Sequence, residues 1–169
     1  TITYLGGYII IILMSPVYAY LSEKTATLIT KTETPFDLFQ FLSDIIRGIL
    51  LALRNFLLES LFTIVLLIFS FVPVVGLLSA PVMIFITAYF YGFAFIDYSL
   101  ERKRYGIKQS IRTISKHKGE AIGIGLPFTL VLSVPFIGSF AAAFLSIPAV
   151  VAATIVATQS IENQQRTTI

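Results

Sequence analysis

The chain has 169 residues, of which 56% are hydrophobic and 12% are charged, and its mean hydropathy is +0.88. In soluble domains about a quarter of the residues are charged, so this composition excludes an ordinary soluble domain. Because the chain has no cysteine, it can form neither a disulfide nor a thiolate metal site.

Three runs of the chain carry no charged residue at all. They cover residues 1–22, 60–96 and 121–161, and are 22, 37 and 41 residues long. Apolar runs longer than about 18 residues indicate membrane segments. We therefore expect an all-α integral membrane protein in which residues 1–169 form a single membrane domain.

The first predicted element is a transmembrane helix over residues 1–22, which ends where Glu23 and Lys24 introduce charge. Pro16 would kink this helix, which a membrane helix tolerates when a neighbour satisfies the freed carbonyl. We expect this to be the one full transmembrane helix of the fragment. Because the chain opens on Thr1 inside an apolar run, we also expect that an N-terminal helix of the natural protein precedes it.

Residues 36–96 are predicted to form a long amphipathic helix followed by a first hairpin. The polar stripe of the helix holds Arg47 and Arg54, which lie seven residues apart and project at nearly the same angle. One interpretation is a helix that lies at the membrane surface or packs beside other helices. The alternative is that both arginines contact an anion at a pore entrance, since a guanidinium offers a planar set of donors. Asp44, three residues before Arg47, is also placed to pair with it.

A Pro-x-x-Gly motif marks the turn of each of two predicted hairpins. Pro73 and Gly76 divide the second apolar run, and Pro135 and Gly138 divide the third, which gives a second hairpin over residues 121–161. The arm before the first turn, residues 60–72, would be about 20 Å long, whereas the hydrocarbon core is about 30 Å thick. We therefore expect both hairpins to be re-entrant, with turns that stay at membrane depth.

Residues 97–120 are predicted to form a basic loop between the hairpins. Seven of the twelve basic residues lie from Arg102 to Lys118, with no acidic residue among them. Basic patches also bind nucleic acid or anionic substrates, but between membrane segments an excess of positive charge is typical of the cytosolic side. We expect this loop to be cytosolic, both hairpins to open toward the cytosol, and no nucleic-acid partner.

Asp97 stands where the second apolar run meets the basic stretch. It is a candidate ligand for a proton or an ion, or else a structural partner of Arg102 or Arg104. His117 is the only histidine and has no second metal-binding side chain near it in sequence, so we expect no metal site. Nothing in the sequence resembles a catalytic constellation, and we expect neither an enzyme nor a cofactor.

Several stretches resemble the CysZ sulfate-permease family, which includes the eukaryotic etoposide-induced endoplasmic-reticulum proteins. They are Phe-Val-Pro-Val-Val-Gly at residues 71–76, Ala-Pro at 80–81 and Phe-Ile-Asp-Tyr-Ser-Leu-Glu-Arg at 95–102. Family members carry a Pro-x-x-Gly or Pro-x-x-Asn hairpin tip followed by an Asp-Tyr-Pro-like motif. Residues 134–138 and 147–154 resemble the second tip and the closing Pro…Gly-Ala-Thr, and residues 15–24 resemble the end of the second family helix.

The resemblance implies uptake of sulfate or a similar oxyanion through the inner membrane by a homo-oligomer that needs no cofactor and contacts membrane lipids. The candidate contacts for the anion or a coupled ion are then Arg47, Arg54, Asp97 and Arg102. Ser99 and Ala152 depart from the proline and the glycine of the family, and the family's glycine-containing segment linked to sulfate binding would precede Thr1. The alternative function is a non-transporting membrane scaffold or assembly factor, as in the eukaryotic branch.

Overall fold

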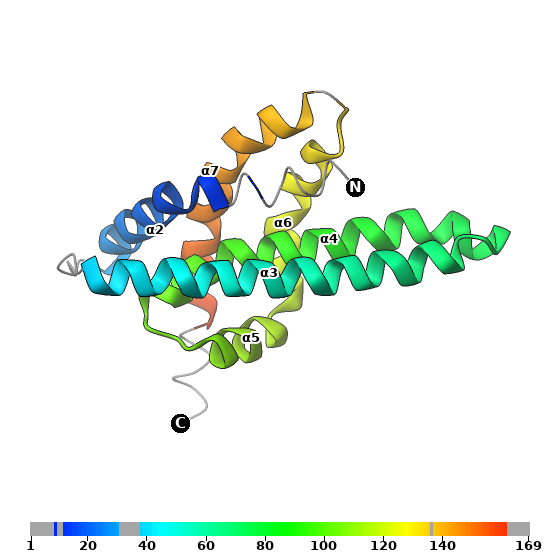
Figure 1. Ribbon diagram of the computed structural model, residues 1–169. Helices are drawn as coiled ribbons and strands as arrows, with labels where there is room; N and C mark the ends of the chain where they lie inside the picture. The colour runs from blue at the N-terminus through cyan, green and yellow to red at the C-terminus, as the bar shows by residue number, and fades with distance from the viewer. Residues whose placement is uncertain (1–8, 10–11, 31–37, 136, 162–169) are drawn as a thin grey trace.

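The computed structural model describes residues 9, 12–30, 38–135 and 137–161, and the regular structure in this part of the chain is entirely helical (Figure 1). The helices are α2 (Ser15–Thr30), α3 (Leu38–Phe69), α4 (Pro73–Arg102), α5 (Ile107–Lys116), α6 (Lys118–Leu132), α7 (Gly138–Val156) and the π-helical turn η1 (Ala157–Ile161). Three segments are long and apolar enough to cross a membrane, namely Ile45–Phe69, Gly76–Arg102 and Gly138–Gln159. The expected all-α membrane protein is confirmed at this level.

The expectation of one full transmembrane helix over residues 1–22 is not supported. The chain continues as α2 beyond Glu23 and Lys24 to Thr30, because no proline or glycine ends the helix there. The three segments with the length and apolarity to cross belong to α3, α4 and α7. Residues 1–8 of the predicted helix lie outside the described part of the chain.

The first hairpin consists of α3 and α4, which run side by side and project from the rest of the molecule (Figure 1). They hold 32 and 30 residues, which correspond to about 48 and 45 Å. The predicted amphipathic helix and the leading arm of the hairpin are thus one helix, since no proline lies between Leu38 and Phe69. Contrary to the expectation, the leading arm of this hairpin is long enough to cross a membrane, because the apolar segment of α3 spans 25 residues.

The second hairpin consists of α6 and α7, which meet at the top of Figure 1. α6 has 15 residues, or about 22 Å, which is less than the thickness of about 30 Å of a hydrocarbon core. Its re-entrant insertion stays a prediction.

The glycines of the two Pro-x-x-Gly motifs have matching surroundings. The N–H of each glycine donates to the carbonyl oxygen of the valine four residues earlier, at 2.8 Å for Gly76 and 2.9 Å for Gly138. A Cβ added to Gly76 would lie 2.5 Å from the carbonyl oxygen of Ser70, and one added to Gly138 would lie 2.6 Å from that of Val131. Glycine is needed at both turns because the incoming helix leaves no room for a side chain.

α4 is the central helix, and it packs against α2, α3, α6 and α7. Its buried aromatic residues fill the core, where the ring of Phe128 lies against Tyr91 and Phe95 at centroid distances of 4.8 and 5.2 Å. Gly92 and Gly125 bring α4 and α6 into backbone contact, since a Cβ at either position would overlap the backbone of the other helix. Small residues at a helix crossing are typical of membrane helix packing.

Residues 97–120, expected to be a loop, are mostly helical. α4 continues to Arg102, residues 103–106 turn the chain, and α5 precedes α6. The apolar side chains Ile107, Ile111 and Ile114 of α5 pack against the core. The high charge of this stretch obscures the amphipathic helical period of α5, in which isoleucines recur on one face.

A polar seam between α3 and α4 as the candidate functional site

Four polar residues of α3, namely Arg47, Arg54, Asn55 and Glu59, lie on the side that meets α4. Asn55 and Glu59 are 1% and 3% exposed, and the buried Leu51 shares their helical face, as does Arg47. The large apolar residues of the other face are exposed, among them Leu50, Leu53, Leu57, Leu61 and Ile64. A helix that buries its polar stripe and exposes its apolar arc suits a lipid environment, where ionisable side chains face the protein interior.

We define the polar seam as Arg47, Arg54, Asn55 and Glu59 of α3 together with Asp97 and Glu101 of α4. Of the interpretations that the sequence left open for the amphipathic helix, packing beside other helices describes this stripe.

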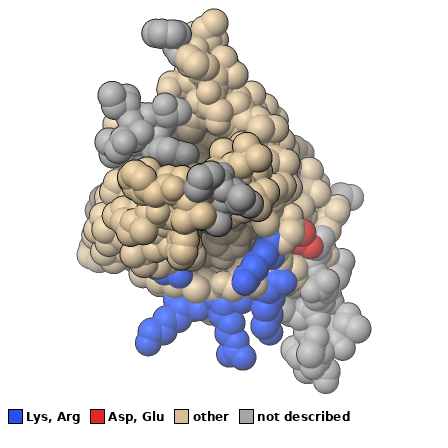
Figure 2. All heavy atoms as spheres, turned by 90° about the vertical axis from the view of Figure 1, so that its right-hand side faces the viewer, with Lys and Arg blue, Asp and Glu red and all other residues tan. Residues whose placement is uncertain are grey.

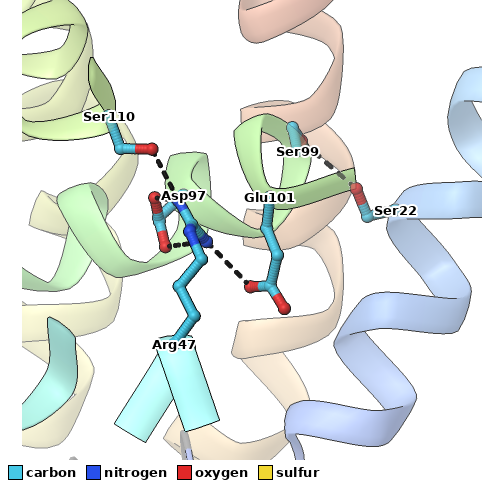
Figure 3. A network of polar contacts seen from close by, with 6 residues as sticks. All are labelled: Ser22, Arg47, Asp97, Ser99, Glu101 and Ser110. Carbon is cyan, nitrogen blue, oxygen red and sulfur yellow. Dashed lines mark hydrogen bonds and ion pairs between the residues drawn. The ribbon is translucent and has the colours of Figure 1, made fainter. Parts of the chain in front are cut away.

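Arg47 is the centre of an ion cluster at one end of the seam (Figure 3). Its Nη1 and Nη2 atoms donate to the two carboxylate oxygens of Asp97 at 3.1 and 2.8 Å. Nη2 also donates to Ser110 Oγ of α5 at 2.6 Å, and Nη1 lies 3.3 Å from Glu101 Oε2. The Arg47 and Asp97 side chains are only 12% and 7% exposed. Two carboxylates therefore face one guanidinium, which leaves Arg47 no free charge for a bound anion.

Asp97 pairs with Arg47 and not, as its place in the sequence suggests, with Arg102 or Arg104. Arg102 lies five residues after Asp97 and so projects from a different side of α4, whereas Arg104 lies beyond the end of α4, in the turn that follows it. Arg102 instead donates from Nη1 to the carbonyl oxygen of Glu23 at 3.3 Å and joins α4 to α2. Arg104 is exposed, with a positive φ of 59° in the turn after α4.

Arg54 lies two helical turns further along α3 and has a different environment. Its Nη1 donates to Asn55 Oδ1 at 2.9 Å, and its guanidinium lies 5.9 Å from the centroid of the Phe93 ring. Both groups are neutral, and within the described residues no carboxylate forms an ion pair with Arg54. The helical spacing places Arg47 and Arg54 on one stripe, and in the structure Asp97 and Glu101 pair with Arg47, whereas no described carboxylate forms an ion pair with Arg54.

A cluster of three hydroxyls joins helices that are distant in sequence. Ser99 Oγ of α4 donates to Thr154 Oγ1 of α7 at 2.9 Å, Thr154 Oγ1 donates to Ser22 Oγ of α2 at 3.1 Å, and the Ser22 and Ser99 oxygens are 3.2 Å apart. All three residues are fully buried. Hydroxyls that satisfy one another across helices are a common way to join membrane helices.

Sequence reasoning missed this cluster and the role of Ser110. A single serine or threonine in an apolar run carries no pattern that points to a partner in another helix. Glu59 and Asn55 lie at helical spacing from Arg47 and Arg54, but this spacing does not show that they are buried.

The comparison with known families decides the identity of the chain at family level. The sequence profile of the family described as sulfate transporter CysZ/etoposide-induced protein 2.4 matches residues 1–143. The chain belongs to this family. No curated protein matches the chain.

The CysZ/etoposide-induced match ends before residues 147–154, which the sequence analysis compared with the closing motif of the family. It covers α3, α4 and the whole polar seam. The Asp-Tyr-Ser motif within it has a structural explanation at each position. Asp97 binds Arg47, the ring of Tyr98 packs edge-on against that of Tyr18 at 5.4 Å, and Ser99, where the family has proline, joins the hydroxyl cluster.

Proposed function

We propose that this CysZ/etoposide-induced family member carries sulfate or a similar oxyanion across the inner membrane, and that Arg54 contacts the anion. The observation that carries this proposal is that Arg54, inside a candidate membrane segment, contacts the neutral groups of Asn55 and Phe93. An uncompensated arginine is costly inside a membrane segment and is found there mainly where it serves a function. Its fork of donors matches the geometry of a tetrahedral oxyanion better than lysine would.

Arg47 has a supporting role in this proposal. Asp97 and Glu101 already neutralise it, so a bound anion would have to displace one of them. The cluster instead holds α3 against α4 and α5, and thereby sets the position of Arg54 along the seam. Neither Asp97 nor Arg102 is assigned a contact with the anion.

The proposed carrier is a homo-oligomer, with the basic segment on the cytosolic side and the α6–α7 turn at membrane depth. The positive charge between Arg102 and Lys118 supports the orientation. The short length of α6 supports the depth of the turn.

Uptake of radiolabelled sulfate into proteoliposomes that contain the full-length protein tests the function. Arg54→Gln should weaken sulfate binding about tenfold or more, because a hydrogen bond to a charged group contributes about 1.5–3 kcal/mol. Arg54→Lys should retain part of the flux, because lysine keeps the positive charge but lacks the planar set of guanidinium donors. Arg104→Gln is the matched control, since Arg104 is an exposed arginine outside the seam, and its flux should equal that of the wild type.

Two results would contradict the proposal. Unchanged flux and affinity in Arg54→Gln would assign Arg54 to structure. A well-folded full-length protein without sulfate-dependent flux or binding would favour the scaffold function instead.

A further inference from the structure

The outer face of α5 carries a row of basic side chains. Lys108, Arg112 and Lys116 recur every four residues and therefore form one stripe along the helix. All three are exposed. In Figure 2 the basic side chains gather along the lower edge of the molecule, beneath a body whose visible surface is mostly uncharged. We call Lys108, Arg112 and Lys116 the basic stripe.

The described part of the chain offers the basic stripe no acidic partner. Among the residues that the structure describes, no acidic side chain pairs with Lys108, Arg112 or Lys116. Three like charges on one face repel each other, so the stripe is best stabilised by an external anionic surface.

The other face of α5 holds the stripe in a defined place. Ile107, Ile111 and Ile114 pack against the core, and the buried Ser110 accepts a hydrogen bond from Arg47. α5 follows directly on the candidate membrane segment that ends at Arg102. It is an amphipathic helix at the end of a membrane segment, which is the level at which lipid headgroups lie.

We propose that the basic stripe docks on the headgroups of anionic phospholipids in the leaflet that borders α5. Anionic lipids attract basic residues next to a membrane segment, and each such residue strengthens binding about fivefold, which corresponds to about 1 kcal/mol. A lipid surface suits the stripe better than a soluble partner because α5 is anchored beside the bilayer and its basic side chains follow a straight line. The stripe is separate from the polar seam, so this inference does not depend on sulfate transport.

The absence of tryptophan from the chain allows a direct test. Gln109→Trp places a single fluorophore on an exposed position next to Lys108. The 169-residue chain is reconstituted into phosphatidylcholine nanodiscs that contain either brominated phosphatidylglycerol or brominated phosphatidylcholine at the same mole fraction. We expect stronger quenching by the brominated phosphatidylglycerol, and we expect this preference to fall at high salt because counter-ions screen the charges.

The substitution Lys108→Gln/Arg112→Gln/Lys116→Gln should abolish the preference while the helical circular dichroism is retained. Arg112→Gln alone should lower it about fivefold. Lys24→Gln, which removes an exposed charge from α2, should leave it unchanged. Millimolar inorganic phosphate should not compete, because the proposed ligand is a headgroup in a lipid surface.

Equal quenching by the two lipids would overturn the proposal, as would a preference that survives the triple substitution. Competition by inorganic phosphate would assign the stripe to a free anion and would also overturn it. Binding of a short single-stranded oligonucleotide or an acidic peptide without any lipid preference would overturn the proposal and show that the basic stripe binds a soluble partner.

Discussion

Arg47 shows how a charge is held within an apolar helix at the scale of one residue. Its bonds to Asp97, Glu101 and Ser110 connect three helices, α3, α4 and α5. The attraction between buried charges compensates for their desolvation only while the partners remain in place. Losing one partner therefore costs more than the net stabilisation that the intact cluster contributes.

Asp97→Ala should lower the free energy of unfolding by about 3–5 kcal/mol, the range for a buried pair that loses one partner. Asp97→Asn should cost less, because the amide oxygen still accepts a hydrogen bond and Glu101 still faces Arg47. Thermal unfolding in detergent, followed by circular dichroism, measures both effects. The charge-neutral double variant Arg47→Gln/Asp97→Asn should be more stable than the sum of the two single substitutions predicts. Strict additivity would show that the two residues are not coupled.

Ser99 is a second residue with a specific role. It replaces the proline expected in the family motif, and its hydroxyl bonds to Ser22 and Thr154. At this position a proline would supply no hydroxyl and no N–H, so the three-helix junction depends on the serine.

At the scale of the element, the crossing of α4 and α6 depends on two glycines. The added Cβ of Gly125 would overlap the backbone carbonyl of Ala88, and that of Gly92 would overlap the carbonyl of Ala121. Backbone atoms cannot rotate away as a flexible side chain can. The two helices must therefore separate to accommodate even one methyl group.

Gly125→Ala should destabilise the protein by about 1–3 kcal/mol, the usual cost of overpacking a core. Gly123→Ala is the matched control on the same helix, because a Cβ there meets nothing within 4 Å. This control should be neutral or more stable by about 0.5–1 kcal/mol, since alanine favours the helix over glycine. Thermal unfolding of the two variants in the same detergent gives the comparison. Equal stability of both would mean that α4 and α6 are not in backbone contact.

At the scale of the whole molecule, the exposed apolar residues of the α6–α7 turn and the basic residues of α5 lie on two different sides of the protein. The turn of the α6–α7 hairpin exposes Val134, Ile137 and Phe140, which suits a turn surrounded by lipid or by apolar protein. The basic residues of α5 lie at the opposite end of α6 from this turn.

Because the chain contains no cysteine, single cysteines report the topology without background. Gln109→Cys should react with a membrane-impermeant thiol reagent only after cell lysis, since an excess of positive charge favours the cytosolic side. Ile137→Cys should react from neither side, because α6 is too short to carry the turn through the bilayer. Labelling of Gln109→Cys in intact spheroplasts would show that the orientation is opposite to the one expected. Labelling of Ile137→Cys from the outside would show that the α6–α7 hairpin crosses the membrane and is not re-entrant.

The candidate site was predictable only in part. The spacing of Arg47 and Arg54 placed both on one stripe, and Asp97 stood out at the boundary between apolar and basic sequence. The pairing of Arg47 with Asp97 joins positions 50 residues apart, and its bond to Ser110 joins positions 63 residues apart. Neither contact leaves a local pattern, because the antiparallel register of α3 and α4 and the docking of α5 bring these residues together.

The sequence by itself determined the properties that arise from local chemistry. Long uncharged runs require helices in a membrane, because a lipid environment leaves no other partner for the backbone polar groups. The Pro-x-x-Gly motifs marked both hairpin turns, because proline and glycine restrict the backbone wherever they occur. Only the tertiary structure decided that α3 is one long helix with its polar stripe turned inward, that the basic segment contains α5, and that Asp97 and Glu101 pair with Arg47 and not with Arg54. These features depend on which side chains meet across helices. Asp97 and Glu101 are distant from α3 in sequence, and they pair with Arg47, whereas no described acid pairs with Arg54 on the same stripe.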